Sequence, residues 1–172
     1  MQTEALAKKF AGKSITRIYT SPIPRAKETA EILSAALKAP VEYADGLREP
    51  DCGILEGRAD EAAWAEHRYW KETWLKGCLL ERGPQDGETC VEVRTRLDRL
   101  ITKLIDEYGE IEAGLLLVTH GALILLGLPE LVSGADQQTL LESGLAHTTL
   151  ISTELQNGKL VLTGLSTRVT GL

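Results

Sequence analysis

The sequence predicts a single α/β domain with a largely parallel sheet that has an antiparallel edge. Apolar, strand-like segments alternate with segments whose apolar residues recur at helical spacing, a pattern typical of a parallel sheet covered by helices. Near the end, residues 148–155 and 159–165 flank Asn157-Gly158, a dipeptide typical of the tight turn of an antiparallel hairpin. The length of 172 residues is typical of one domain, which we expect to span residues 1–172.

In the first half, a short helix is expected over residues 3–10 and a strand over 15–19. Ser21-Pro22 is expected to start the next helix with Ser21 as its cap, because proline is tolerated in the first turn. A further short strand is expected over residues 41–43, followed by a polar loop over 46–57. The apolar stripe of the second helix consists of Ala26, Ala30, Leu33 and Leu37.

In the second half, residues 59–76 are expected to be helical and contain tryptophans that we place in the core rather than in a ligand platform. Thr89 and Glu92 have the spacing of a capping box, and the amphipathic helix that follows is expected to end at Tyr108. Residues 114–119 are expected to form a buried strand, residues 122–128 a helix, and the stretch after it a polar loop. The tryptophans are Trp64, Trp70 and Trp74.

The composition argues against several classes of partner. The net charge is −6 and the basic residues are scattered, which disfavours nucleic acids and anionic membranes. No apolar run of about eighteen residues and no secretory leader is visible, so we expect a cytoplasmic chain. The cysteines Cys52, Cys78 and Cys90 have no metal-ligand spacing and are expected to be reduced. We expect no metal and no cofactor.

Two segments share the pattern of an apolar strand, a sharp turn and a helix. Arg25 begins the helix of the first segment, and His120 lies at the turn of the second. Helix N-termini favour anions, and an arginine fork matches phosphate oxygens. Gly121 lets the backbone approach a ligand closely. Each residue has an ordinary structural explanation by itself, but together they predict a small anion pocket on an acidic protein.

Several motifs resemble those of the histidine phosphatase superfamily, also called phosphoglycerate mutase-like. The string SPIPRAKETA resembles S-P-x-x-R-A-x-x-T-A, and residues 47–57 resemble L-x-E-x-x-x-G-x-x-E-G. Residues 83–89 are similar to the family's P-x-G-E-[ST] loop, and residues 116–121 resemble its second-histidine motif. The motifs occur in the family's order across about two-thirds of the chain, which makes the match specific.

The resemblance implies a three-layer α/β/α sandwich and metal-free phosphoryl transfer through a phosphohistidine. Arg25 would bind phosphate oxygens, and His120 would bind phosphate and stabilise the charge on its equatorial oxygens. Glu49 would be the acid that protonates the leaving group. Glu56 and Glu88 are competitors for that role, and each is more simply explained as a structural or solvated residue.

One defining family motif is absent from these residues. The family's nucleophile belongs to an R-H-G motif at the end of the first strand, and none of His67, His120 and His147 follows an arginine and precedes a glycine. The chain therefore resembles an N-terminally truncated family member without its central strand, which we expect between the two strands that carry the pocket. Three explanations for the missing strand remain open: the start of the sequence was placed too late, the gene is truly truncated, or another chain supplies the strand. The first is favoured.

These observations leave more than one function open. The favoured one is a phosphomonoester phosphatase of the small branch, which includes enzymes for sugar phosphates or α-ribazole phosphate. The chain by itself is expected to be inactive without the R-H-G strand. The alternatives are a phosphoglycerate mutase-type phosphotransferase, a catalytically inactive phosphoester-binding relative and a destabilised fragment. The expected partner is a small phosphoester, His147 has a minor claim to touch it, and a homodimer remains open.

Overall fold

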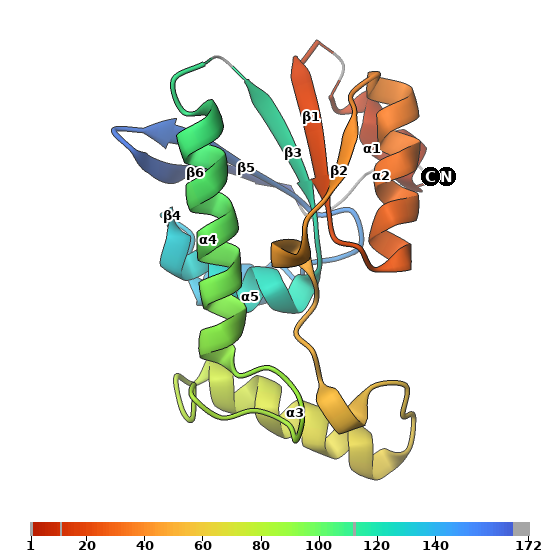
Figure 1. Ribbon diagram of the computed structural model, residues 1–172, viewed down its shortest axis with the longest axis vertical. Helices are drawn as coiled ribbons and strands as arrows, with labels where there is room; N and C mark the ends of the chain where they lie inside the picture. Colours follow the sequence, from red (N-terminus) through yellow and green to blue (C-terminus); the bar gives the residue numbers. More distant parts are fainter. Residues whose placement is uncertain (1, 11, 112, 167–172) are drawn as a thin grey trace.

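The computed structural model describes residues 2–10, 12–111 and 113–166 and confirms the predicted α/β class (Figure 1). The helices are α1 (Gln2–Lys8), α2 (Pro24–Leu37), α3 (Glu61–Leu75), α4 (Cys90–Tyr108), α5 (Gly121–Leu131) and α6 (Gln137–Glu142), with short 3₁₀ helices η1 (Asp45–Leu47) and η2 (Gly53–Leu55). The strands are β1 (Ile15–Thr20), β2 (Val41–Tyr43), β3 (Gly114–Val118), β4 (Val132–Ser133), β5 (Leu150–Gln156) and β6 (Lys159–Ser166).

The first sheet is parallel and has the strand order β2-β1-β3. β1 and β3 are direct neighbours, with Thr20 opposite Val118. The expectation of an empty slot between these two strands is therefore wrong, because they satisfy each other's backbone groups. Since parallel strands end at the same edge of a sheet, this pairing places the turns after β1 and β3 side by side.

The second sheet has the order β4-β6-β5 and contains the predicted hairpin. β5 and β6 pair antiparallel, and β4 pairs with β6 in parallel. Asn157 and Gly158 have φ of 52° and 76°, the left-handed conformation that a tight hairpin turn requires. The antiparallel edge is confirmed, but it belongs to a separate sheet.

The outer edge of β3 has no strand partner among the described residues. Its five residues, Gly-Leu-Leu-Leu-Val, are all only partly buried, although a continuous apolar run is typical of a parallel strand buried on both faces. The side chains and backbone of β3 and β5 both line one cavity of about 1600 Å³. The cavity therefore borders β3, whereas no gap separates β1 from β3.

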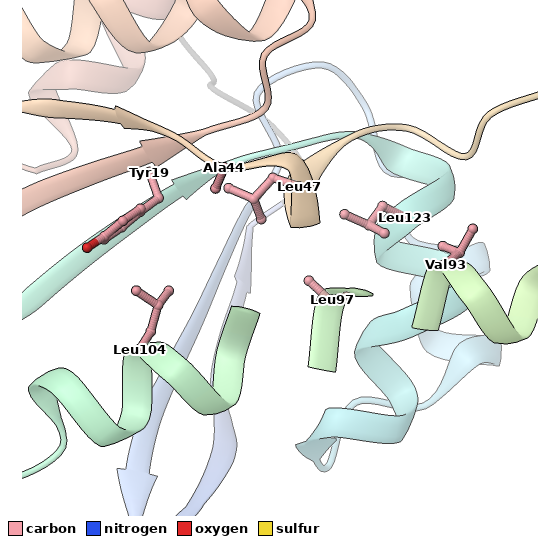
Figure 2. Close-up of a cluster of buried hydrophobic side chains, with 7 residues drawn as sticks. All are labelled: Tyr19, Ala44, Leu47, Val93, Leu97, Leu104 and Leu123. Carbon is pink, nitrogen blue, oxygen red and sulfur yellow. The ribbon is translucent and has the colours of Figure 1, made fainter. Parts of the chain in front are cut away.

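The main core lies between the first sheet and helix α4 (Figure 2). Leu97 and Leu104 of α4 face Tyr19 of β1 and Leu47 of η1, and Leu123 of α5 completes the group at the end of the sheet. A second cluster packs α1 and α2 on the other face, including Phe10, Ile18 and Leu33. Helices therefore cover both faces of the first sheet.

The helix boundaries correct one expectation and confirm others. Helix α2 begins at Pro24, and Ser21 does not cap it, because the preceding Ile23 is the N-cap residue and makes no side-chain bond. The capping box of Thr89 and Glu92 is present at the start of α4. Helix α6 occupies part of the stretch expected to be a loop, with Asp136 as its side-chain cap.

The predicted core role of the tryptophans holds for Trp74, which is buried, and not for Trp64, which is exposed. Among the described residues, no helix combines the length and apolar character that crossing a membrane requires.

Candidate active site

The two predicted anion-binding elements meet at the carboxyl edge of the first sheet. Arg25 is the second residue of α2, and His120 is the N-cap residue of α5. β1 leads into the first helix and β3 into the second, so the direct pairing of these strands brings the residues together. Backbone N–H groups at the start of α5 have no partner within the helix and face the same space.

Glu49 joins this pair from the loop between η1 and η2. Its Oε2 accepts a hydrogen bond from Nη2 of Arg25 at 2.9 Å and lies 3.5 Å from Nδ1 of His120. Its Oε1 accepts from the backbone N–H of Ala122 at 3.0 Å. The three residues predicted from the motifs are thus in contact, and the groups that favour an anion converge on one carboxylate.

His120 is buried against the end of β1. Its Nε2 lies 2.8 Å from Oγ of Ser21, which also accepts a hydrogen bond from the backbone N–H of Ile23 at 3.2 Å. The ring is thus held with Nε2 toward Ser21 and Nδ1 toward Glu49.

Burial lowers the pKa of His120, and the positive charges of Arg25 and Arg96 add to this effect while Glu49 opposes it. The lowered pKa favours the uncharged form of the imidazole.

Gly121 borders open space. A Cβ atom at this position would meet no described atom within 4 Å, so the glycine is not required by packing inside the protein. The space in front of it is available to a ligand, which fits the proposed close approach of the backbone.

The competing acids have other partners. Oε1 of Glu56 accepts from the backbone N–H of Cys52 at 2.9 Å, and Glu88 pairs with Arg96 at 2.7 Å. Burial and then the neighbouring carboxylates raise the pKa of the Cys52 thiol, in the same loop, to about 11, which disfavours the reactive thiolate. Of the three glutamates, Glu49 alone contacts Arg25 and His120 in the described residues.

The other two histidines line the same cavity as Arg25, Glu49 and His120 but have different contacts. His67 is on α3 and makes an edge-to-face ring contact with Trp64, with 5.9 Å between the centroids. His147 is exposed before β5, on the wall of the large cavity. Neither forms a described hydrogen bond with Arg25, Glu49 or His120.

Two residues of the site were not singled out from the sequence. The sequence predicts Ser21 to be a helix cap, and its position directly after β1 is the only signal that it faces the site. Arg96 lies among other charged residues of α4, and its contacts are with a loop about fifty positions earlier, so no local pattern marks it. No group of histidine, cysteine and acidic residues suited to a metal ion occurs within residues 2–10, 12–111 and 113–166.

Comparison with known proteins gives a consistent picture. The family model of the histidine phosphatase superfamily (branch 1) matches residues 1–167. A probable phosphoglycerate mutase of Yersinia enterocolitica is 33% identical over 136 residues, which are 74% of this chain and 61% of the relative. The corresponding protein of Salmonella arizonae is 32% identical over 123 residues, or 67% of this chain and 55% of the relative. The chain thus spans about three-fifths of the length of the curated relatives it matches.

Solved structures agree in fold. The phosphoserine phosphatase of Entamoeba histolytica, crystallised as a His-to-Ala mutant with phosphoserine, has a TM-score of 0.74 at 24% identity, covering 98% of this chain and 82% of that one. The α-ribazole phosphatase of Shigella flexneri has a TM-score of 0.73 at 21% identity, and the match covers 95% of this chain and 79% of that one. With the motifs, the fold and the family model in agreement, the chain belongs to the histidine phosphatase superfamily.

Proposed function

We propose that these residues form the anion-binding and acid-donating part of a histidine-type phosphomonoesterase. The observation that supports this most directly is the convergence of Arg25, the N–H of Ala122 and His120 on the carboxylate of Glu49. A phosphate group bound in place of this carboxylate would receive the same donors, and the displaced Glu49 would lie beside its ester oxygen.

The proposed reaction needs a nucleophile on the side of phosphorus opposite the leaving oxygen. An incoming imidazole nitrogen forms the P–N bond while the P–O ester bond breaks, and protonated Glu49 gives its proton to the departing oxygen. Water then attacks phosphorus while the Glu49 carboxylate takes one of its protons, the P–N bond breaks, the electron pair of that bond returns to the imidazole nitrogen, and inorganic phosphate leaves. His120 is poorly suited to the nucleophile's part, because both of its ring nitrogens already face protein groups, Ser21 and Glu49.

The free edge of β3 suggests where the nucleophile enters. An extended segment paired in parallel with β3 would end at the same edge of the sheet as Thr119 and His120. We propose that such a segment, ending in Arg-His-Gly, occupies the cavity between β3 and β5 in the active protein. It would hydrogen-bond to the open edge and cover the apolar side chains of β3.

The test is to extend the chain with a strand and loop that carry Arg-His-Gly, and to measure hydrolysis of an aryl phosphate. We expect no appreciable turnover from the 172-residue chain, activity and higher stability from the extended chain, and acid-labile phosphohistidine on the added histidine. The matched control replaces only the added histidine with alanine and should keep the stability but lose the activity. Strong turnover by the 172-residue chain that is lost in His120→Ala or His147→Ala would refute the proposal.

A phosphoglycerate mutase-type transferase is the second candidate, because the relatives above 30% identity are named as probable phosphoglycerate mutases. The extended chain distinguishes the two by product analysis: a phosphatase releases inorganic phosphate, and a mutase returns the phosphoryl group to a phosphoglycerate. A binding relative would bind phosphate without turnover even in the extended form.

A further inference from the structure

Arg96, on the second turn of α4, holds the loop that carries Glu49 by its backbone. Its Nη1 donates to the carbonyl oxygen of Gly46 at 3.0 Å and approaches that of Asp45 at 3.5 Å. Its Nη2 donates to the carbonyl oxygens of Arg48 at 2.9 Å and Glu49 at 3.2 Å. The side chain is only 19% exposed. One guanidinium thus contacts most of the carbonyl groups along this turn.

Glu88 fixes the guanidinium and the far end of the same loop. Its Oε1 accepts from Nε of Arg96 at 2.7 Å, and its Oε2 accepts from Nη2 at 3.0 Å, a bidentate pair. Oε2 also accepts from the backbone N–H of Asp51 at 2.9 Å, and the backbone N–H of Glu88 donates to the carbonyl oxygen of Asp51 at 2.9 Å. The loop is therefore attached to the start of α4 on both sides of Glu49.

This attachment adds to other contacts of the loop: the Glu49 carboxylate also accepts from the backbone N–H of Ala122 at 3.0 Å, and the carbonyl oxygen of Leu47 accepts from the hydroxyl of Thr119 at 2.8 Å. The side chain of Glu49 is partly exposed. Its ion pair with Arg25 involves a guanidinium that is 62% exposed, so the ion pair alone holds the Glu49 carboxylate weakly. The bidentate pair of Arg96 and Glu88 is largely buried and is therefore a stronger restraint than the exposed ion pair of Arg25 and Glu49.

We propose that Arg96, oriented by Glu88, is a positioning residue that sets the place of the Glu49 carboxylate next to His120 and Arg25. The role of Glu49 as proton donor rests on the proposed function, whereas the position of its carboxylate does not. Lysine cannot replace Arg96 in this role, because an ammonium lacks the fork that binds several carbonyl groups and a carboxylate together.

The experiment measures the pKa of His120 by NMR titration of its ring protons, which requires no turnover and so stands apart from the test of phosphatase activity. The charges around this imidazole are Glu49, which raises its pKa, and Arg25 and Arg96, which lower it. If Arg96 positions Glu49, Arg96→Lys lets the carboxylate move away. We expect the pKa of His120 to fall by about 0.5 unit or more, and we expect a fall in Glu49→Gln as well.

A double-mutant cycle separates positioning from the direct effect of the Arg96 charge. In the Glu49→Gln background, Arg96→Lys should no longer lower the pKa of His120, because no carboxylate remains to be displaced. Arg94→Lys is the matched control, because Arg94 lies on the same helix and is about as buried. Its guanidinium also contacts a carbonyl oxygen and a carboxylate, but these belong to Leu126 and Glu130 rather than to the loop of Glu49. It should leave the titration of His120 unchanged.

Glu88→Gln is the second variant, in case Arg96→Lys fails to fold. It keeps the shape of the side chain and weakens the hold on Arg96, so the pKa of His120 should move in the same direction by a smaller amount. The proposal is overturned if folded Arg96→Lys or Glu88→Gln titrates like the unmodified protein, or if Arg94→Lys causes the same shift.

Discussion

Nε2 of His120 lies 2.8 Å from Oγ of Ser21, and both residues are buried. One follows β3 and the other follows β1, so this contact ties together the carboxyl ends of these two paired strands. It also fixes the ring so that the opposite nitrogen, Nδ1, faces Glu49. The orientation of His120 is therefore set by the strand pairing as well as by its own helix.

The first prediction concerns the buried imidazole. Because the pKa of His120 is lower in the folded protein than the ordinary value of 6.5, the unfolded chain binds the proton more readily. The free energy of unfolding should be highest above pH 6.5 and decrease as the pH falls from there through the folded-state pKa. Denaturant unfolding at pH 5 and 7.5 measures the difference. His120→Gln should reduce it, and His147→Gln, at an exposed position, should not. The prediction is contradicted if the difference in unfolding free energy between pH 5 and 7.5 is the same in all three proteins.

The second prediction concerns Arg25. Arg25→Ala removes a charge-assisted donor from the pocket and should weaken vanadate binding by about 1.5 kcal/mol, which is roughly tenfold in Kd. Arg25→Lys should recover only part of this loss, because a point charge lacks the planar fork. Calorimetric titration with vanadate measures both. Unchanged affinity in Arg25→Ala would remove Arg25 from the site.

The third prediction concerns the charge of Glu49. Its carboxylate occupies the donors that an anion would use, so Glu49→Gln should tighten binding of inorganic phosphate by about 1 kcal/mol. Glu56→Gln is the matched control, because Glu56 bonds to the backbone of Cys52 instead. Calorimetry with phosphate at neutral pH distinguishes the two. Weaker binding in Glu49→Gln would show that the carboxylate does not compete with the anion.

The fourth prediction concerns Gly121. Since a Cβ atom there would contact no described atom, Gly121→Ala should leave the melting temperature nearly unchanged and weaken vanadate binding. Gly114→Ala provides the contrast, because its Cβ would lie 2.1 Å from the carbonyl oxygen of Ser14 and should destabilise the fold. If Gly121→Ala binds vanadate as tightly as the unmodified protein, no ligand approaches this backbone position.

Local patterns in the sequence were sufficient for much of the fold. The capping box at Thr89, the helix after it and the turn at Asn157-Gly158 depend on residues close in sequence, so their signals are local. The convergence of Arg25 and His120 followed from the repeated strand–turn–helix pattern, and the position of Glu49 came with the family resemblance.

The errors share a physical cause. Ser21 was assigned as a cap from its identity, but the next turn places its hydroxyl against a histidine ninety-nine positions away. Which strand edge has no partner among the described residues depends on which strands pair, and sequence order does not fix that pairing. Arg96 was missed for the same reason, because its acceptors are carbonyl groups of a distant loop, which any residue type could supply.

The separation of the strands into two sheets has a consequence for the order of folding. β5 and β6 are joined by a two-residue turn, so their pairing closes a very short loop, whereas β1 and β3 must find each other across about a hundred residues. Because the anion pocket is built on the ends of β1 and β3, it exists only after this slower, long-range pairing. During refolding, amide protection in the hairpin should therefore precede recovery of vanadate binding.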